Sequence, residues 1–92
     1  MLEGVGGASF AIRPDPAPLG QPLSVTVPSA DGARVQIVRD RDGIEVAGGD
    51  VRRGERSVML TSPAQPGAYT VRVTMQRGRG VVSLVQALRL RR

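Results

Sequence analysis

Apolar residues alternate with polar ones along most of the chain, and this period-two pattern constrains the fold more than any other feature of the sequence. It is clearest at residues 69–75, where every second side chain is large and apolar. Successive side chains of a β-strand point to opposite faces, so strict alternation indicates strands that are buried on one side. Helical periodicity is almost absent between Phe10 and Leu90. We therefore predict an all-β fold.

Prolines, glycines and aspartates interrupt the alternation about every ten residues and predict the connections between strands. Strands are expected at residues 10–12, 23–27, 33–39, 44–46, 57–61, 69–75 and 81–90. Connections are expected at residues 14–22, 28–32, 40–43, 48–54, 62–67 and 76–80. The first connection contains four prolines, which neither a helix nor a central strand accepts. About seven short strands with regularly spaced turns are typical of a β-sandwich or barrel.

The chain has 92 residues, enough for one small domain with a thin core. Residues 9–92 are predicted to form this domain, and residues 1–8 a glycine-rich N-terminal arm that cannot order itself. The first residues have neither the basic nor the apolar region of a signal peptide. No apolar run approaches the roughly 18 residues of a membrane span. We therefore expect a chain made in the cytoplasm that has no membrane partner.

Histidine and cysteine are both absent, so the commonest general base and the usual thiol and zinc ligands are missing. The eight carboxylates lie mostly in predicted turns, where aspartate caps backbone amides. The segment Asp40-Arg41-Asp42-Gly43 is superficially like the start of a calcium loop, but a strand follows where further oxygen ligands are needed. We interpret it as a hairpin turn. No enzymatic activity, cofactor or metal site is expected.

Residues 66–73, Pro-Gly-Ala-Tyr-Thr-Val-Arg-Val, resemble the immunoglobulin-like superfamily. In that superfamily a Gly-x-Tyr motif before the penultimate strand forms a tyrosine corner, whose hydroxyl bonds to upstream backbone. Residues 19–27, Leu-Gly-Gln-Pro-Leu-Ser-Val-Thr-Val, are similar to the second strand of bacterial and phage Ig-like modules. The resemblance implies an immunoglobulin-like antiparallel β-sandwich of about seven strands, with Tyr69 as a buried structural corner residue.

The resemblance does not extend to antibody-type domains. Val71 stands where those domains have their second cysteine, and the chain has no tryptophan for the third strand. Antigen-style recognition is therefore not implied. The superfamily serves mostly adhesion, spacing and decoration, and the fold alone does not choose among these roles.

The net charge is +5, and all thirteen basic residues are arginine. This balance favours a partner with an acidic surface. Single-strand nucleic-acid binders combine a basic groove with stacking aromatic side chains, whereas Phe10 and Tyr69 are the only aromatic residues here. Nucleic acid is therefore a disfavoured partner, although binding of the duplex backbone by arginine stays an alternative.

Four arginines are expected to gather at one end of the predicted sandwich. If the strands alternate in direction, the connections at residues 28–32, 48–54 and 76–80 lie together there, and the N-terminal arm starts nearby. The arginines are Arg52, Arg53, Arg77 and Arg79, and they outnumber the acidic residues expected there, Asp31 and Asp50. This end is interpreted either as a solvated loop surface or as a partner-docking end. In the second case Leu2 and Val5 are the apolar anchors of the arm.

The last predicted strand is apolar on both faces. Val82, Leu84, Leu88 and Leu90 fall on one face, and Val81, Val85 and Ala87 on the other. A solvent-exposed face is not normally so apolar. Either other parts of the same chain cover the second face, or another protein does.

Taken together, these features favour a non-enzymatic structural or interaction protein. The first choice is a phage-type virion decoration or accessory subunit, made in the host cytoplasm and docked on capsid or other virion proteins. One alternative is an Ig-like module of a bacterial surface or secreted protein. Another is a basic nucleic-acid-associated protein. Homo-oligomer formation stays open.

Overall fold

The computed structural model describes residues 10–28, 31–77 and 79–92, and the elements in these ranges are nine β-strands and no helix. The predicted all-β class is confirmed. The proposed arm, residues 1–8 with Leu2 and Val5, lies outside the described residues. The strands are β1 (Ala11–Arg13), β2 (Ala17–Pro18), β3 (Pro22–Thr26), β4 (Ala33–Arg39), β5 (Glu45–Val51), β6 (Ser57–Thr61), β7 (Tyr69–Arg77), β8 (Gly80–Leu88) and β9 (Leu90–Arg91).

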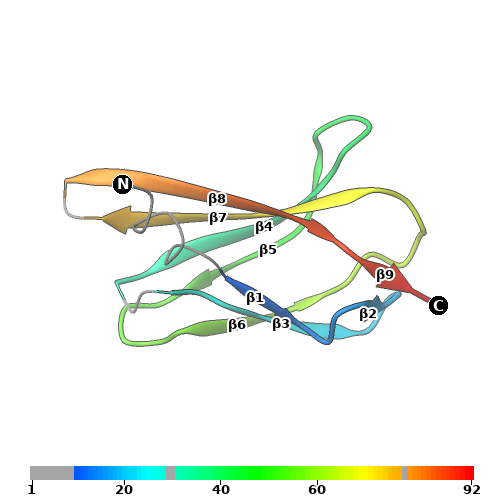
Figure 1. The fold of residues 1–92 in the computed structure, drawn as a ribbon, viewed down its shortest axis with the longest axis horizontal. Helices are drawn as coiled ribbons and strands as arrows, with labels where there is room; N and C mark the ends of the chain where they lie inside the picture. The colour runs from blue at the N-terminus through cyan, green and yellow to red at the C-terminus, as the bar shows by residue number, and fades with distance from the viewer. Residues whose placement is uncertain (1–9, 29–30, 78) are drawn as a thin grey trace, which may run out of the picture.

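The described strands form two antiparallel sheets and one short parallel pair. The first sheet has the order β1-β3-β6, the second has the order β5-β4-β7-β8, and β2 pairs with β9. In Figure 1 the three-stranded sheet runs along the lower side of the molecule, and β7 and β8 run along the upper side. The long ladders of the second sheet join β4 to β5, β4 to β7 and β7 to β8.

The hydrophobic core contains side chains from both antiparallel sheets. In the second sheet, Val35 lies opposite Val73 and Ile37 opposite Val71, and all four are fully buried. In the first sheet, the alternate positions of β3 and β6 supply further buried aliphatic side chains. Buried and less buried side chains therefore alternate through residues 33–38 and 69–75, as expected for strands that are buried on one side. Removing each such side chain from water contributes about 1.5–3 kcal/mol.

The predicted loop at residues 48–54 is wrong over its first half, because β5 continues through Gly48 and Gly49 to Val51. The glycines at these positions permit close approach of neighbouring atoms. A Cβ atom on Gly49 would lie 3.1 Å from the side chains of Val58 and Leu60 on β6, and one on Gly48 would lie 2.6 Å from Glu45 Oε2. Paired glycines therefore mark tight packing here, although sequence patterns associate them with loops.

Two short strands that were not predicted separately, β2 and β9, arise where the chain changes partner. The chain leaves β3 after β1, passes Pro14 and Pro16 in cis peptide bonds, and then pairs with β9 through β2. The last strand pairs with β7 as far as Leu88, and from Leu90 it pairs with β2. The predicted connection at residues 14–22 is thus interrupted by β2. The described residues therefore form nine strands, whereas about seven were predicted.

Candidate functional site

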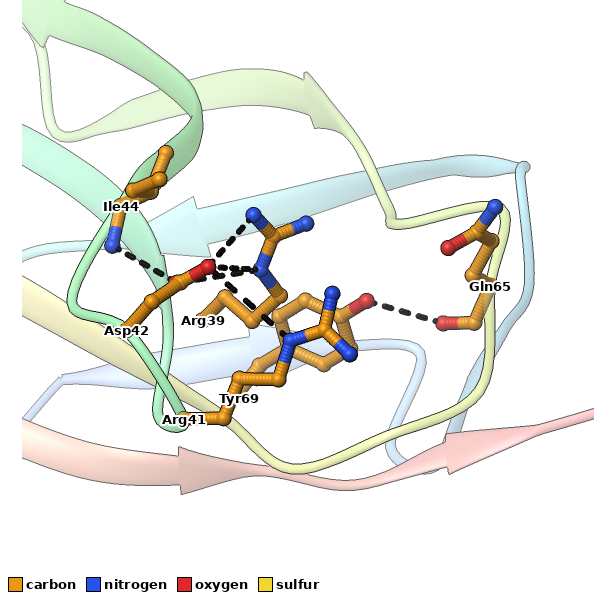
Figure 2. Close-up of polar contacts among 6 residues, drawn as sticks. All are labelled: Arg39, Arg41, Asp42, Ile44, Gln65 and Tyr69. Atoms are coloured by element: carbon orange, nitrogen blue, oxygen red, sulfur yellow. Dashed lines mark hydrogen bonds and ion pairs between the residues drawn. The ribbon is translucent and has the colours of Figure 1, made fainter.

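Tyr69 begins β7, and its ring is buried with 5% of its surface exposed. Its hydroxyl donates a hydrogen bond of 3.0 Å to the backbone carbonyl of Gln65, four residues upstream, as Figure 2 shows. This bond ties the connection before β7 to the strand itself. In this position Tyr69 does not offer its ring to a ligand.

The hairpin between β4 and β5 is held by an arginine–aspartate pair next to Tyr69 (Figure 2). The Arg39 guanidinium donates to both carboxylate oxygens of Asp42, with distances of 2.7–3.1 Å, and the Ile44 backbone N–H donates to Asp42 Oδ1. The hydrogen bonds from Arg39 lower the pKa of Asp42, and the same contact raises the pKa of Arg39. The segment is the hairpin turn that the sequence analysis expects.

A small cavity lies beside this corner, lined by Arg39, Arg41, Tyr69 and residues 65–68. Its volume is about 110 Å³. Ligand pockets usually measure roughly 300–1,000 Å³, so the cavity is too small for a cofactor or a typical organic substrate. Among the described residues no group of three His, Cys, Asp or Glu is placed to hold a metal ion.

The strand ends next to the three connections of the predicted arginine cluster lie at the same end of the molecule (Figure 1). Arg52, Arg53 and Arg79 are exposed there, and none of them has an ion-pair partner among the described residues. Arg77 is the last residue of β7. Asp50 does not offset these charges, because Arg34 Nη1 on the adjacent strand lies 3.1 Å from its carboxylate.

The outer face of the four-stranded sheet carries charged side chains on β4, β5 and β7 but none on β8. On β4 and β5, Arg34 pairs with Asp50 at 3.1 Å and with Glu45 at 3.6 Å, and Gln36 donates to Glu45 at 2.7 Å. On β8 the same face carries Val81 and Val85, which are 61% and 64% exposed, and Val85 lies opposite the exposed Arg72 of β7.

This exposed β8 strip, defined as Val81, Val85 and Ala87, is the second apolar face of the last predicted strand. All three residues are exposed, whereas Val82, Leu84 and Leu90 pack against the core and Leu88 belongs to it. An apolar second face could be covered either by the same chain or by another protein. The described residues of this chain do not cover it.

β8 is also an edge strand in the described sheet, because no described strand pairs with its side opposite β7. From Gly80 to Leu88 it contains no charged residue and no proline. Proteins usually protect a long edge strand with charges, prolines or a bulge. The opposite edge strand, β5, has such protection in Glu45, Asp50 and a register shift beside Val38.

The alternation of residues 81–90 indicates the apolar face of β8 but not the position of this strand at an edge. Edge position depends on which strands pair, and this is not encoded in any local pattern. One local signal was present, because a run of nine residues without charge or proline is unusual for an exposed strand.

Comparison with protein-family models, with curated proteins and with solved structures finds no match for this chain. In the part of the chain that the structure describes, no helix is long and apolar enough to cross a membrane.

Replacing Tyr69 by Phe should lower the free energy of unfolding by about 0.5–1.5 kcal/mol, because the Gln65 carbonyl loses its donor in a partly buried position. Urea denaturation measures this change, with the m-value expected to stay constant. Thr70→Val is the control. It removes the exposed bond from Thr70 Oγ1 to Asp40 and should cost less, because both groups regain water. Equal stability of Tyr69→Phe and the parent would contradict a structural role for the hydroxyl.

Replacing Arg39 by Gln should raise the pKa of Asp42 toward its ordinary value of about 3.9. Because the folded-state pKa is lowered, the pair stabilises the fold above about pH 4, and this contribution is lost as pH falls through the folded-state pKa. NMR titration of the Asp42 carboxyl carbon measures the shift. Arg41→Gln is the control and should change it less, since Arg41 Nε lies 3.9 Å from the carboxylate. Equal shifts of the Asp42 pKa in the two variants would show that the nearby positive charge as a whole, and not the contact with Arg39, lowers this pKa.

Proposed function

We propose that this chain is a non-enzymatic, immunoglobulin-like interaction module that docks as a structural or accessory subunit on a larger protein assembly. The observation that carries the proposal is the exposed β8 strip, which places two valines in solvent on an uncharged edge strand. Exposed apolar side chains on one face of an uncharged edge strand favour a protein–protein contact.

The strand order supports the immunoglobulin-like part of the proposal. Three strands, β1-β3-β6, face four strands, β5-β4-β7-β8, across a shared core, which is the layout of a small β-sandwich. The hydroxyl of Tyr69 bonds to backbone just upstream, as in a tyrosine corner. The sequence similarity of residues 19–27 and 66–73 to Ig-like modules agrees with this layout.

A virion is the assembly that we propose, with the chain made in the host cytoplasm and bound to capsid or other virion proteins. Support comes from the resemblance of residues 19–27 to phage modules and from the arginine-rich end, which suits an acidic protein surface. An Ig-like module of a bacterial surface or secreted protein would use the same exposed β8 strip. The two readings differ in the assembly that is bound and not in the surface that binds it.

An affinity-tagged chain isolated from its native source should be recovered in a stable complex with other proteins, identified by mass spectrometry. Val85→Ser should reduce its occupancy in the complex roughly tenfold, because about 1.5 kcal/mol of apolar burial is lost. Met59→Ser is the matched control, since Met59 is 63% exposed but lies on β6 of the other sheet. It should leave occupancy unchanged.

Two results would count against the proposal. Recovery of the chain as an isolated protein would remove the assembly role. Recovery that depends on nucleic acid, and is lost on nuclease treatment, would favour the nucleic-acid-associated alternative.

A further inference from the structure

The outer edge of β8, with which no described strand pairs, is bounded at both ends. At its C-terminal end the backbone is already used, because Ala17 N–H donates to the Arg89 carbonyl and Leu19 N–H to the Arg91 carbonyl, both at 2.8 Å. At its N-terminal end the strand begins at Gly80, after the connection to β7. The available edge is therefore β8 itself, residues 80–88, and at ~3.4 Å per residue it is about 30 Å long.

Backbone groups along this edge favour a strand as the occupant. An edge strand presents a row of N–H and C=O groups that an extended segment can pair with, while its side chains provide selectivity. Here the outer side chains beside that row are Val81, Ser83, Val85 and Ala87. They are small or β-branched and uncharged, so they suit a partner strand with β-branched or small apolar side chains at alternate positions.

Arginines flank the uncharged edge on both sides. Arg79 immediately precedes β8, and Arg89 immediately follows it. Arg79 has no ion-pair partner among the described residues, and Arg89 makes only an exposed contact of 3.7 Å with Asp15. A partner strand of either direction would therefore meet a positive charge at each end. Carboxylate side chains at both ends of the partner segment would complement them.

A second copy of this chain is a poor occupant for the same reason. In an antiparallel pair of two β8 strands with Leu84 opposite Leu84, Arg79 of each copy lies opposite Arg89 of the other. A parallel pair brings Arg79 beside Arg79 and Arg89 beside Arg89. Like charges directly opposite each other are destabilising in a sheet. The charge pattern therefore disfavours self-association and favours a different partner.

We infer that β8 is a strand-addition site for a partner protein, which contributes an extended, uncharged segment with apolar residues at alternate positions and an acidic residue at each end. This inference rests on the proposed function and names how the docking occurs. The added strand extends the sheet to β5-β4-β7-β8-partner and covers the exposed β8 strip.

The test uses the full chain and a synthetic peptide of about eleven residues, the length that spans Arg79 to Arg89. The peptide alternates valine and threonine and carries glutamates at both ends, and a second peptide carries lysines there. Fluorescence anisotropy measures affinity, and NMR measures which backbone amides shift. The glutamate-ended peptide should bind about tenfold more tightly than the lysine-ended one. The largest amide shifts should fall on residues 80–88.

A charge swap provides the sharper readout. Arg79→Glu combined with Arg89→Glu should reverse the preference, so that the lysine-ended peptide binds more tightly. The matched control is Arg41→Glu combined with Arg56→Glu, which changes the net charge by the same amount. The two pairs also match in their ion pairing. Arg41, like Arg89, makes a weak exposed contact, at 3.9 Å from Asp42. Arg56, like Arg79, has no ion-pair partner among the described residues. The control should retain the preference for glutamate ends.

A single substitution tests the edge itself. Val85→Glu places a charge on the strand, opposite Arg72 on β7, so the fold and its melting temperature should be kept while peptide binding is lost. Three results would overturn the inference: equal binding of both peptides, amide shifts centred elsewhere, or self-association of the parent chain that Val85→Glu abolishes. The last would make a second copy the occupant. In each case the proposed function would stand if the native complex still contained the chain, bound through another surface.

Discussion

The architecture depends on the apolar rows that β4 and β7 form across their shared ladder. Val35 packs opposite Val73 and Ile37 opposite Val71, and all four side chains are removed from solvent. With only two aromatic residues in the chain, aliphatic rows of this kind supply most of the buried surface. Because β4 and β7 occupy the centre of the sheet, only its outer face and its two outer strands remain for contact with other molecules.

The two outer strands of this sheet have opposite characters. On the β5 side, Glu45 and Asp50 hold Arg34 in an ion-pair network, and a register shift interrupts the ladder. Each exposed pair contributes little stability, about 0–1 kcal/mol, but charge and irregularity make that edge unattractive to another strand. On the β8 side neither device is present between Gly80 and Leu88. This contrast within one sheet is the physical basis for assigning docking to β8.

Sequence alternation predicted the parts of the fold that depend on neighbouring residues. The bounds of the strands at residues 33–39 and 57–61 agree with the structure, because alternation and turn residues define both locally. Gly48 and Gly49 were misassigned because they pair with Gln36 and Val35 of β4, and this pairing is not visible in the local sequence. The short strand β2 and the division between β8 and β9 were missed because each depends on a change of partner strand.

The same limit applies to the candidate site. Sequence alone indicated that the last strand has a second apolar face, since this follows from period two. It could not indicate that the face borders an edge without a partner among the described strands, because this depends on the strand order of the sheet. Arginine clustering was predicted from topology, and Figure 1 shows the strand ends next to its three connections at one end of the molecule. The proposed anchors Leu2 and Val5 lie outside the described residues, so their part in docking stays a prediction.

The flanking arginines have two effects on an edge strand that would otherwise pair indiscriminately. They attract a segment with acidic ends, which raises the rate of encounter, and they repel a second copy of the same strand. Both effects are screened by salt within about 10 Å at moderate ionic strength. The valines and the backbone edge contribute the part of binding that salt does not weaken. In the proposed complex, Arg79 and Arg89 therefore determine which segment binds. The strand between them determines how long that segment stays bound.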